Sequence, residues 1–168
     1  MSKRKRVLVI ALPFVALSLI GWWFFQWVYW PRVTQPSTVS AAEAGDLQLL
    51  QSLQQQGMSL DYQDPRKFKW TPLMAAVYSG QSNVVVYLLK QGVDIEARDA
   101  HGNTALMWAV DVADTNFSIV QLLLTAGAKT NVTNDFGRTV FDAAGANPEK
   151  ERLLRILSQY LSQWPQEK

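Results

Sequence analysis

Few side chains in this 168-residue sequence have the type and spacing that catalysis or metal binding requires. Cysteine is absent, which excludes disulfides, zinc–thiolate sites and thiol nucleophiles. His101 is the single histidine, so a site that needs two imidazoles is also excluded. Asp111 and Asp114 are three positions apart, a spacing that the solvated end of a helix explains equally well. Without a phosphate-binding loop or a nucleophile motif, the sequence predicts a non-enzymatic protein with no cofactor, metal or small-molecule substrate.

The positive charge of the sequence is concentrated in its first six residues. Four of the 16 lysines and arginines stand at positions 3–6, which leaves 12 against the 14 acidic residues. The pI near 8.9 therefore reflects the N-terminal tail. Nucleic-acid binding needs a basic face on the folded part of a protein, so we do not expect it here.

The next segment, residues 7–30, is predicted to be a transmembrane anchor. It contains no charged residue and would span about 36 Å as a helix at ~1.5 Å per residue. A bilayer core of about 30 Å needs roughly 20 apolar residues. Aromatic residues crowd the far end, as in the belt at a membrane–water interface. The basic residues before the segment place residues 1–6 in the cytoplasm and everything after it across the membrane.

A cleaved signal peptide is the competing interpretation, because small residues stand at positions 40–42. The apolar stretch, however, is longer than the usual ~7–15 residues, and the small residues lie well beyond its end. We therefore expect an anchor that is not cleaved. Residues 31–38 include two prolines and form a short polar linker, which reaches at most about 25 Å at ~3.3 Å per residue. Such a linker would hold the following domain near the bilayer.

The remaining sequence repeats itself with a period near 33 residues. One motif occurs three times, at Thr71–Ala76, Thr104–Ala109 and Thr139–Ala144. A threonine can cap the start of a helix, and Pro72 suits the first helical position, where its missing N–H leaves no hydrogen bond unmade. Apolar runs that follow the motif indicate a second helix in each unit.

Glycines mark the ends of these units. Gly57, Gly92 and Gly127 stand where a left-handed residue should end the second helix. The segments 99–102 and 134–137 begin with Asp or Asn and end with Gly, which is typical of a turn. One helical pair cannot bury its own apolar stripe, whereas stacked neighbours can.

A period near 33 residues with a T-P-L-x-x-A motif resembles the ankyrin repeat. The resemblance implies an all-α ankyrin-repeat solenoid of about four repeats over residues 39–161, preceded by one N-terminal transmembrane helix. Residues 162–168 would form a C-terminal tail, and the last repeat, from residue 138, would be truncated. The turns would be the hairpin fingers that link ankyrin repeats. The first finger, residues 64–70, is two residues longer than the others and has Lys69 where the turn glycine should be.

By analogy with the family, we expect a partner-binding surface in the concave groove and along the fingers. Trp70 and Tyr78, beside a basic first finger, have the composition of a binding hot spot. Because the fingers recur once per repeat, residues at equivalent positions should lie in rows. One row is Phe68, His101 and Phe136, and the parallel row is Trp70, Asn103 and Arg138. The predicted partner-binding residues are Arg66, Lys67, Phe68, Trp70, Tyr78, His101, Asn103, Asp111, Phe136 and Arg138.

Some of these residues have simpler interpretations. A solvated charged loop, or contact with anionic lipid, would also explain the basic first finger. His101 can be a surface residue of a finger tip. We assign Met74, Met107 and Trp108 on the first helices to packing.

The function that this organisation predicts is binding of a protein partner by a domain on the periplasmic side of the inner membrane. Small membrane-anchored ankyrin proteins of bacterial type resemble immunity proteins, and this implies an inhibitor of a toxin or lipase. A scaffold or assembly factor for an envelope or stress-response complex is the alternative. Fold alone does not name a partner, and the sequence leaves both open.

Overall fold

The computed structural model describes residues 37–112 and 116–163. The predicted anchor at residues 7–30 lies outside these ranges and stays a prediction. Within them, no helix combines the length and apolar character that crossing a bilayer requires.

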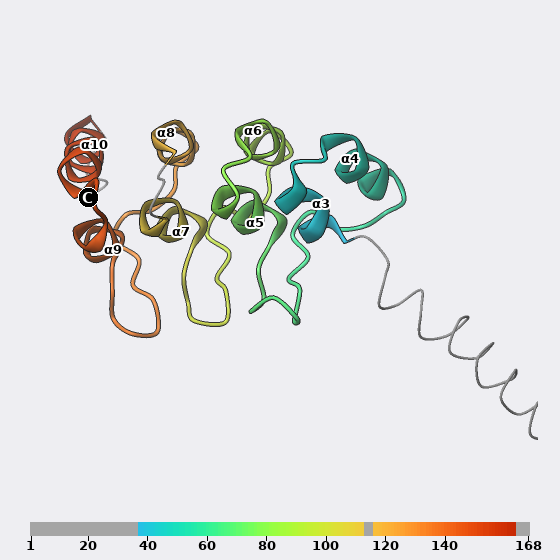
Figure 1. Ribbon diagram of the computed structural model, residues 1–168, viewed down its shortest axis with the longest axis horizontal. Helices are drawn as coiled ribbons and strands as arrows, with labels where there is room; N and C mark the ends of the chain where they lie inside the picture. Colours follow the sequence, from blue (N-terminus) through green and yellow to red (C-terminus); the bar gives the residue numbers. More distant parts are fainter. Residues whose placement is uncertain (1–36, 113–115, 164–168) are drawn as a thin grey trace, which may run out of the picture. The chain divides into compact units, whose positions relative to one another are not determined.

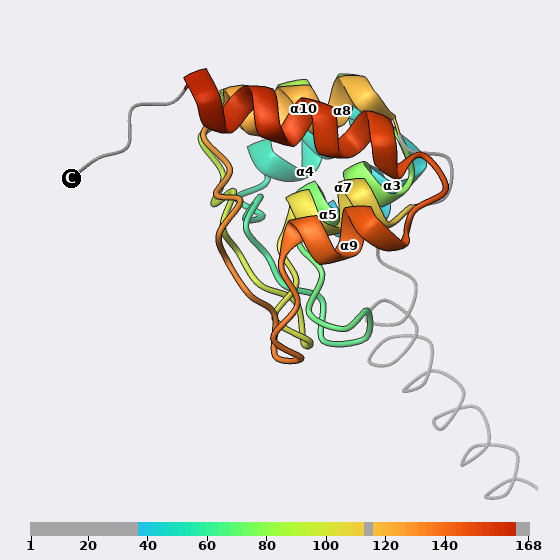
Figure 2. The same ribbon diagram turned by 90° about the vertical axis from the view of Figure 1, so that its left-hand side faces the viewer.

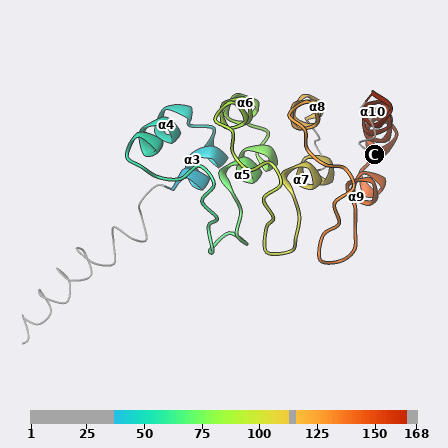
Figure 3. The same cartoon turned by 180° about the vertical axis from the view of Figure 1, so that it is seen from behind.

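The described part of the chain is all-α, and its helices pair into four helix–turn–helix units (Figure 1). The helices are α3 Thr38–Ala44, α4 Leu47–Gln55, α5 Pro72–Tyr78, α6 Ser82–Lys90, α7 Ala105–Asp111, α8 Phe117–Thr125, α9 Val140–Ala146 and α10 Lys150–Gln163. The odd-numbered helices form an inner row and the even-numbered helices an outer row (Figures 1 and 3). The long loops between units project together beyond the inner row, and Figure 2 shows this along the stack with α9 and α10 in front.

The inner helices begin as the sequence predicts. The hydroxyl oxygens of Thr71, Thr104 and Thr139 accept hydrogen bonds from the backbone N–H three residues on, and Pro72 occupies the first turn of α5. Each of these caps satisfies a backbone donor that the first turn of a helix leaves free. The inner helices are each seven residues long.

The left-handed glycines are confirmed. Gly57, Gly92 and Gly127 have φ angles of 85°, 73° and 92°, and each follows the end of an outer helix. Gly102 and Gly137, at the ends of the second and third turns, have φ angles of 76° and 73°. These conformations close each unit in the same way, which keeps the repeats in register.

The apolar core lies within the units and between neighbouring units. The largest completely buried side chains include Leu50, Leu73, Leu88, Leu106 and Leu123. Hydrogen bonds at a spacing of 33 residues also join successive units: Asp94 N donates to Asp61 Oδ1, and Lys129 N donates to Glu96 Oε1, each at 2.8 Å. Each unit thus buries its stripe against the next, as the repeat pattern requires.

The last unit has a longer outer helix than the others. It contains both helices, and α10 has 14 residues where the other outer helices have nine. Asn147, buried between α9 and α10, donates through Nδ2 to the carbonyls of Val110 and Val112 in the preceding unit. The Arg152 guanidinium lies 3.8 Å from the centre of the Phe117 ring. The final unit is therefore tied to its neighbour by polar and cation–π contacts as well as by its core.

Candidate functional site

Three rings form a row across the tips of the loops. The centroids of Phe68 and His101 are 5.5 Å apart, and those of His101 and Phe136 are 6.0 Å apart. Backbone hydrogen bonds set this spacing, since Ala100 N donates to the carbonyl of Phe68 and Asp135 N to that of His101. The predicted row is therefore present. Phe68 is 63% exposed and Phe136 69% exposed, so the row presents apolar surface to solvent.

The first loop reaches this arrangement with an unusual backbone. Phe68 and Lys69 are both left-handed, with φ angles of 51° and 59°, although neither is glycine. A left-handed residue with a side chain is disfavoured by roughly 1–2 kcal/mol. Asp64 opposes this strain, because its carbonyl accepts from Lys67 N and Lys69 N while its own N–H donates to the Trp70 carbonyl. The loop closed in this way holds Phe68 at the tip.

The basic residues of the first loop are largely paired within the domain. Arg66 Nε lies 3.1 Å from Asp64 Oδ1, and this hydrogen-bonded guanidinium holds the pKa of Asp64 below its usual value. Lys67 Nζ forms an ion pair with Glu43 of the first unit. Both cations are thus engaged in the free protein, whereas Lys69 is exposed at the tip. Arg66 and Lys67 support the loop, and their predicted role in partner binding stays a prediction.

An aromatic cluster connects two inner helices below the second loop. The Trp70 ring centroid lies 5.0 Å from those of Tyr78 and Trp108, and the Tyr78 and Trp108 centroids are 5.7 Å apart. Trp108 Nε1 donates to Asp99 Oδ2 at 3.0 Å. Trp70 Nε1 is buried without an acceptor among the described residues. Tyr78 remains 47% exposed and is the part of the cluster that another molecule could cover.

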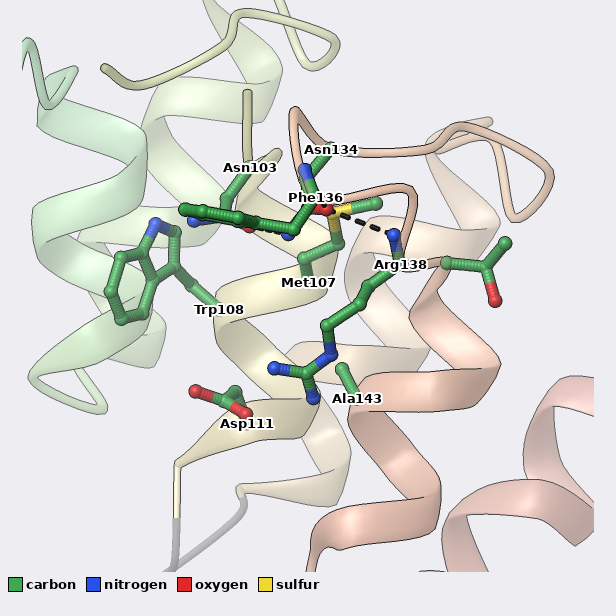
Figure 4. Close-up of a pocket in the computed structure, with 9 residues that line it drawn as sticks. Asn103, Met107, Trp108, Asp111, Asn134, Phe136, Arg138 and Ala143 are labelled. Atoms are coloured by element: carbon green, nitrogen blue, oxygen red, sulfur yellow. Dashed lines mark hydrogen bonds between the residues drawn. The ribbon is translucent and has the colours of Figure 1, made fainter. Parts of the chain in front are cut away.

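A pocket lies beside this cluster, between α7, the third loop and α9 (Figure 4). Four of the predicted residues line it, namely Asn103, Asp111, Phe136 and Arg138. Met107 and Ala143 are buried side chains in its wall, and Trp108 joins the pocket to the aromatic cluster. Two of the loops and the end of α7 thus bring predicted residues to one hollow.

The polar rim of the pocket is held by its own hydrogen bonds. Asn134 Oδ1 accepts from Phe136 N and Arg138 N, and Asn134 Nδ2 donates to Asn103 Oδ1 at 2.8 Å. Asn103 in turn donates through Nδ2 to Asp99. These bonds fix the backbone on both sides of the pocket, and the charged groups of Asp111 and Arg138 are left exposed at its mouth.

Comparison with known proteins agrees with this architecture. The family profile described as "Ankyrin repeats (3 copies)" matches residues 39–134, which is more than half of the chain. The chain belongs to the ankyrin-repeat family. Ankyrin repeats are protein–protein interaction modules and typically carry no enzymatic activity.

Several relatives share the repeats. The chain is 38% identical over 98 residues to the mouse "Ankyrin repeat and SAM domain-containing protein 6", a match that covers 58% of this chain and 11% of the relative. It is 34% identical over 100 residues to the fowlpox virus "Putative ankyrin repeat protein FPV031", covering 59% and 29%. It is 30% identical over 128 residues to the rice "Probable E3 ubiquitin-protein ligase XBOS32", covering 76% and 25%. The chain therefore spans less than a third of the length of each.

The ankyrin domain also contains site residues that the sequence reasoning missed. Trp108, assigned to packing, is half-buried and joins the aromatic cluster to the pocket. The signal was its alignment with Ala75 in the preceding repeat, because a tryptophan replaces the small residue of the motif. Asn134 organises the pocket rim, and only its place at the start of a turn was recognised. No group of acidic or histidine side chains in the described ranges could hold a metal ion.

Proposed function

We propose that this ankyrin-repeat protein binds a protein partner along its inner face, defined here as the tip row Phe68, His101 and Phe136 together with Trp70, Tyr78, Trp108 and the pocket. Exposed aromatic side chains on a pre-formed scaffold carry the proposal. Phe68, Tyr78 and Phe136 are among the exposed large apolar residues of the domain, and all three lie on this face. Buried aromatic anchors dominate the affinity of many interfaces, and rigid ones lose little entropy on binding.

The proposal extends to location. The uncharged segment at residues 7–30, with basic residues before it, would anchor the chain in the inner membrane and leave the ankyrin domain in the periplasm. A short linker would then keep the inner face close to molecules that arrive at the membrane. We further propose that the partner is neutralised by this contact, in the manner of an immunity protein acting on a toxin or lipase.

Reporter fusions test the location. An alkaline-phosphatase fusion after Trp164 should be active, and a reporter that works only in the cytoplasm should be silent at the same position. The mature chain should retain its first residues and resist extraction with alkaline carbonate. The opposite reporter pattern would overturn the periplasmic location, and a new N-terminus near Ala42 would overturn the anchor.

Site-specific crosslinking in cells tests the binding surface. A photoreactive phenylalanine analogue placed at Phe136 or Phe68 should give a discrete adduct with one protein. The same analogue at Lys90, exposed at the end of outer helix α6, is the matched control and should give none. A neutraliser should yield a stoichiometric complex with a single partner, whereas adducts with several members of a larger assembly would favour a scaffold. Adducts only from Lys90 would show that the partner uses the outer helices.

A further inference from the structure

The pocket beside Trp108 has a size and a charge arrangement that define what can enter it. Its volume is about 110 Å³. An engineered cavity of about 150 Å³ lined by aliphatic and aromatic side chains binds benzene, so this smaller hollow suits a branched aliphatic side chain better than an aromatic ring. Met107, Trp108 and Ala143 supply an apolar wall, and the Phe136 ring lies at the edge (Figure 4).

Two opposite charges flank the mouth of the pocket. Figure 4 shows the Arg138 side chain extending from the third finger toward Asp111, which ends α7. The ion pairs within the described residues are Arg66–Asp64 and Lys67–Glu43, so Arg138 and Asp111 do not come within ion-pairing distance of each other or of other described charges. Asp142 accepts hydrogen bonds from the backbone N–H and the hydroxyl of Thr139. These bonds lower the pKa of Asp142, and the positive charge of Arg138 lowers it further. A guanidinium and a carboxylate are therefore available to a partner.

The uncharged polar groups of the rim are less available. Asn103 and Asn134 bond to each other, to Asp99 and to the backbone of the third finger. A partner that replaced these bonds would leave backbone N–H groups without acceptors, which is unfavourable. Recognition at this pocket is therefore expected to use the apolar wall and the two free charges.

We infer that the pocket receives one branched aliphatic side chain of a partner segment in which that residue stands between an acidic and a basic residue. The acidic side chain pairs with Arg138, whose guanidinium can hold a carboxylate through two parallel hydrogen bonds. The basic side chain pairs with Asp111, and the aliphatic residue packs between Met107, Trp108 and Phe136. The inference deepens the proposed function and rests on it, because it names the partner chemistry for one part of the inner face.

Selection from a random dodecapeptide library displayed on phage, with the intact chain as the target, tests this inference. Enriched peptides should contain Leu, Ile or Val between an acidic and a basic residue. Arg138→Glu and Asp111→Lys should each weaken binding of a synthetic enriched peptide by at least about tenfold, because charge-assisted hydrogen bonds are lost and two like charges are brought together. Lys90→Glu is the matched charge reversal on an outer helix and should change nothing.

A double reversal keeps the inference falsifiable if a single variant folds poorly. The Asp111→Arg, Arg138→Asp chain should reject the original peptides and bind versions in which the acidic and basic residues have exchanged places. Unchanged preference in that variant, enriched peptides without the pattern, or no enrichment at all would overturn the inference. If patternless peptides still lose binding on Tyr78→Ala, the proposed function stands and only the pocket assignment fails; if they are insensitive to Tyr78→Ala as well, both fail.

Discussion

The first finger, residues 64–70, and the second, residues 99–103, connect equivalent helices by different chemistry. In the second finger, Asp99 accepts hydrogen bonds from the backbone N–H groups of His101 and Asn103, and Gly102 takes the left-handed position. The first finger has Asp64 at the corresponding place, but left-handed Phe68 and Lys69 follow it, and Arg66 pairs with Asp64.

The difference suggests that the second finger serves mainly to stabilise the domain and the first mainly to expose aromatic side chains. The second finger follows the local rules of a tight turn, and its aspartate also anchors Trp108. The first finger departs from those rules and gains two residues, which place Phe68 at the tip and Trp70 against Tyr78. Departures from local sequence rules in otherwise regular proteins tend to coincide with functional sites. The first finger is therefore expected to contribute more to binding than to stability.

Replacing Gly102 with alanine should produce the largest loss of stability. A Cβ atom there would lie 2.9 Å from the backbone nitrogen of Asp135 and 2.6 Å from its Oδ1, at a φ of +76°. Left-handed strain and the clash together should lower the free energy of unfolding by about 3 kcal/mol. Urea unfolding of the intact chain, followed by circular dichroism, measures this.

Gly92 is the matched control for that change. It has a similar φ of +73°, but a Cβ atom would meet nothing within 4 Å. Gly92→Ala should therefore lower the unfolding free energy by only about 1 kcal/mol. Equal losses for the two variants would mean that contact between the second and third fingers contributes little.

The two tryptophans should lose different amounts of stability on replacement by phenylalanine. Trp108→Phe removes the hydrogen bond to Asp99 and should destabilise the domain by about 1–2 kcal/mol. Trp70→Phe also loses the five-membered ring of the indole, but the N–H that it removes is buried without an acceptor among the described residues, so its loss of stability should be smaller than that of Trp108→Phe. Thermal unfolding of both variants decides this, and a larger loss for Trp70→Phe would contradict the assigned environments.

Lys69→Gly should stabilise the domain. Glycine adopts the φ of 59° found at this position without steric penalty, although its unfolded chain has more freedom. The net gain should be about 0.5 kcal/mol, measured as a higher urea midpoint with an unchanged slope. A loss of stability would mean that the lysine side chain supports the loop.

The smallest expected effect is a pH dependence of the unfolding free energy that comes from the Arg66–Asp64 pair of the first finger. The hydrogen bond from Arg66 is the largest cause that holds the pKa of Asp64 below its ordinary 3.8. A depressed carboxylate pKa stabilises the folded state above pH 3.8, and this contribution is lost as the pH falls through the lower folded value. Between pH 5 and pH 2, Arg66→Gln should therefore lose less unfolding free energy than the original chain. Identical acid limbs would show that the ion pair adds nothing to stability.

Local signals in the sequence predicted most of the repeat architecture. The threonine caps, the left-handed glycines and the row formed by Phe68, His101 and Phe136 all depend on residues close in sequence or exactly one repeat apart. Such features recur at equivalent positions of each repeat, so aligning the repeats is enough to predict where they lie.

Contacts between residues that occupy different positions in their repeats could not be predicted in this way. Lys67 pairs with Glu43 from another unit, and Trp108 contacts Trp70, which belongs to a different finger and is not its equivalent in the repeat. The left-handed backbone at Phe68 contradicts residue preference and persists because several hydrogen bonds converge on Asp64. The 14 residues of α10 also depart from the nine of the other outer helices, so the repeat period does not predict this length.

The affinity of the captured partner for the intact chain, compared between Tyr78→Ala and Lys90→Ala, tests the central claim most directly. Tyr78 is the exposed member of the aromatic cluster, and truncating a binding anchor lowers affinity by about 2 kcal/mol, or roughly thirtyfold. We predict that loss for Tyr78→Ala and unchanged affinity for Lys90→Ala. Normal binding by Tyr78→Ala together with loss of binding by Lys90→Ala would contradict recognition through the inner face.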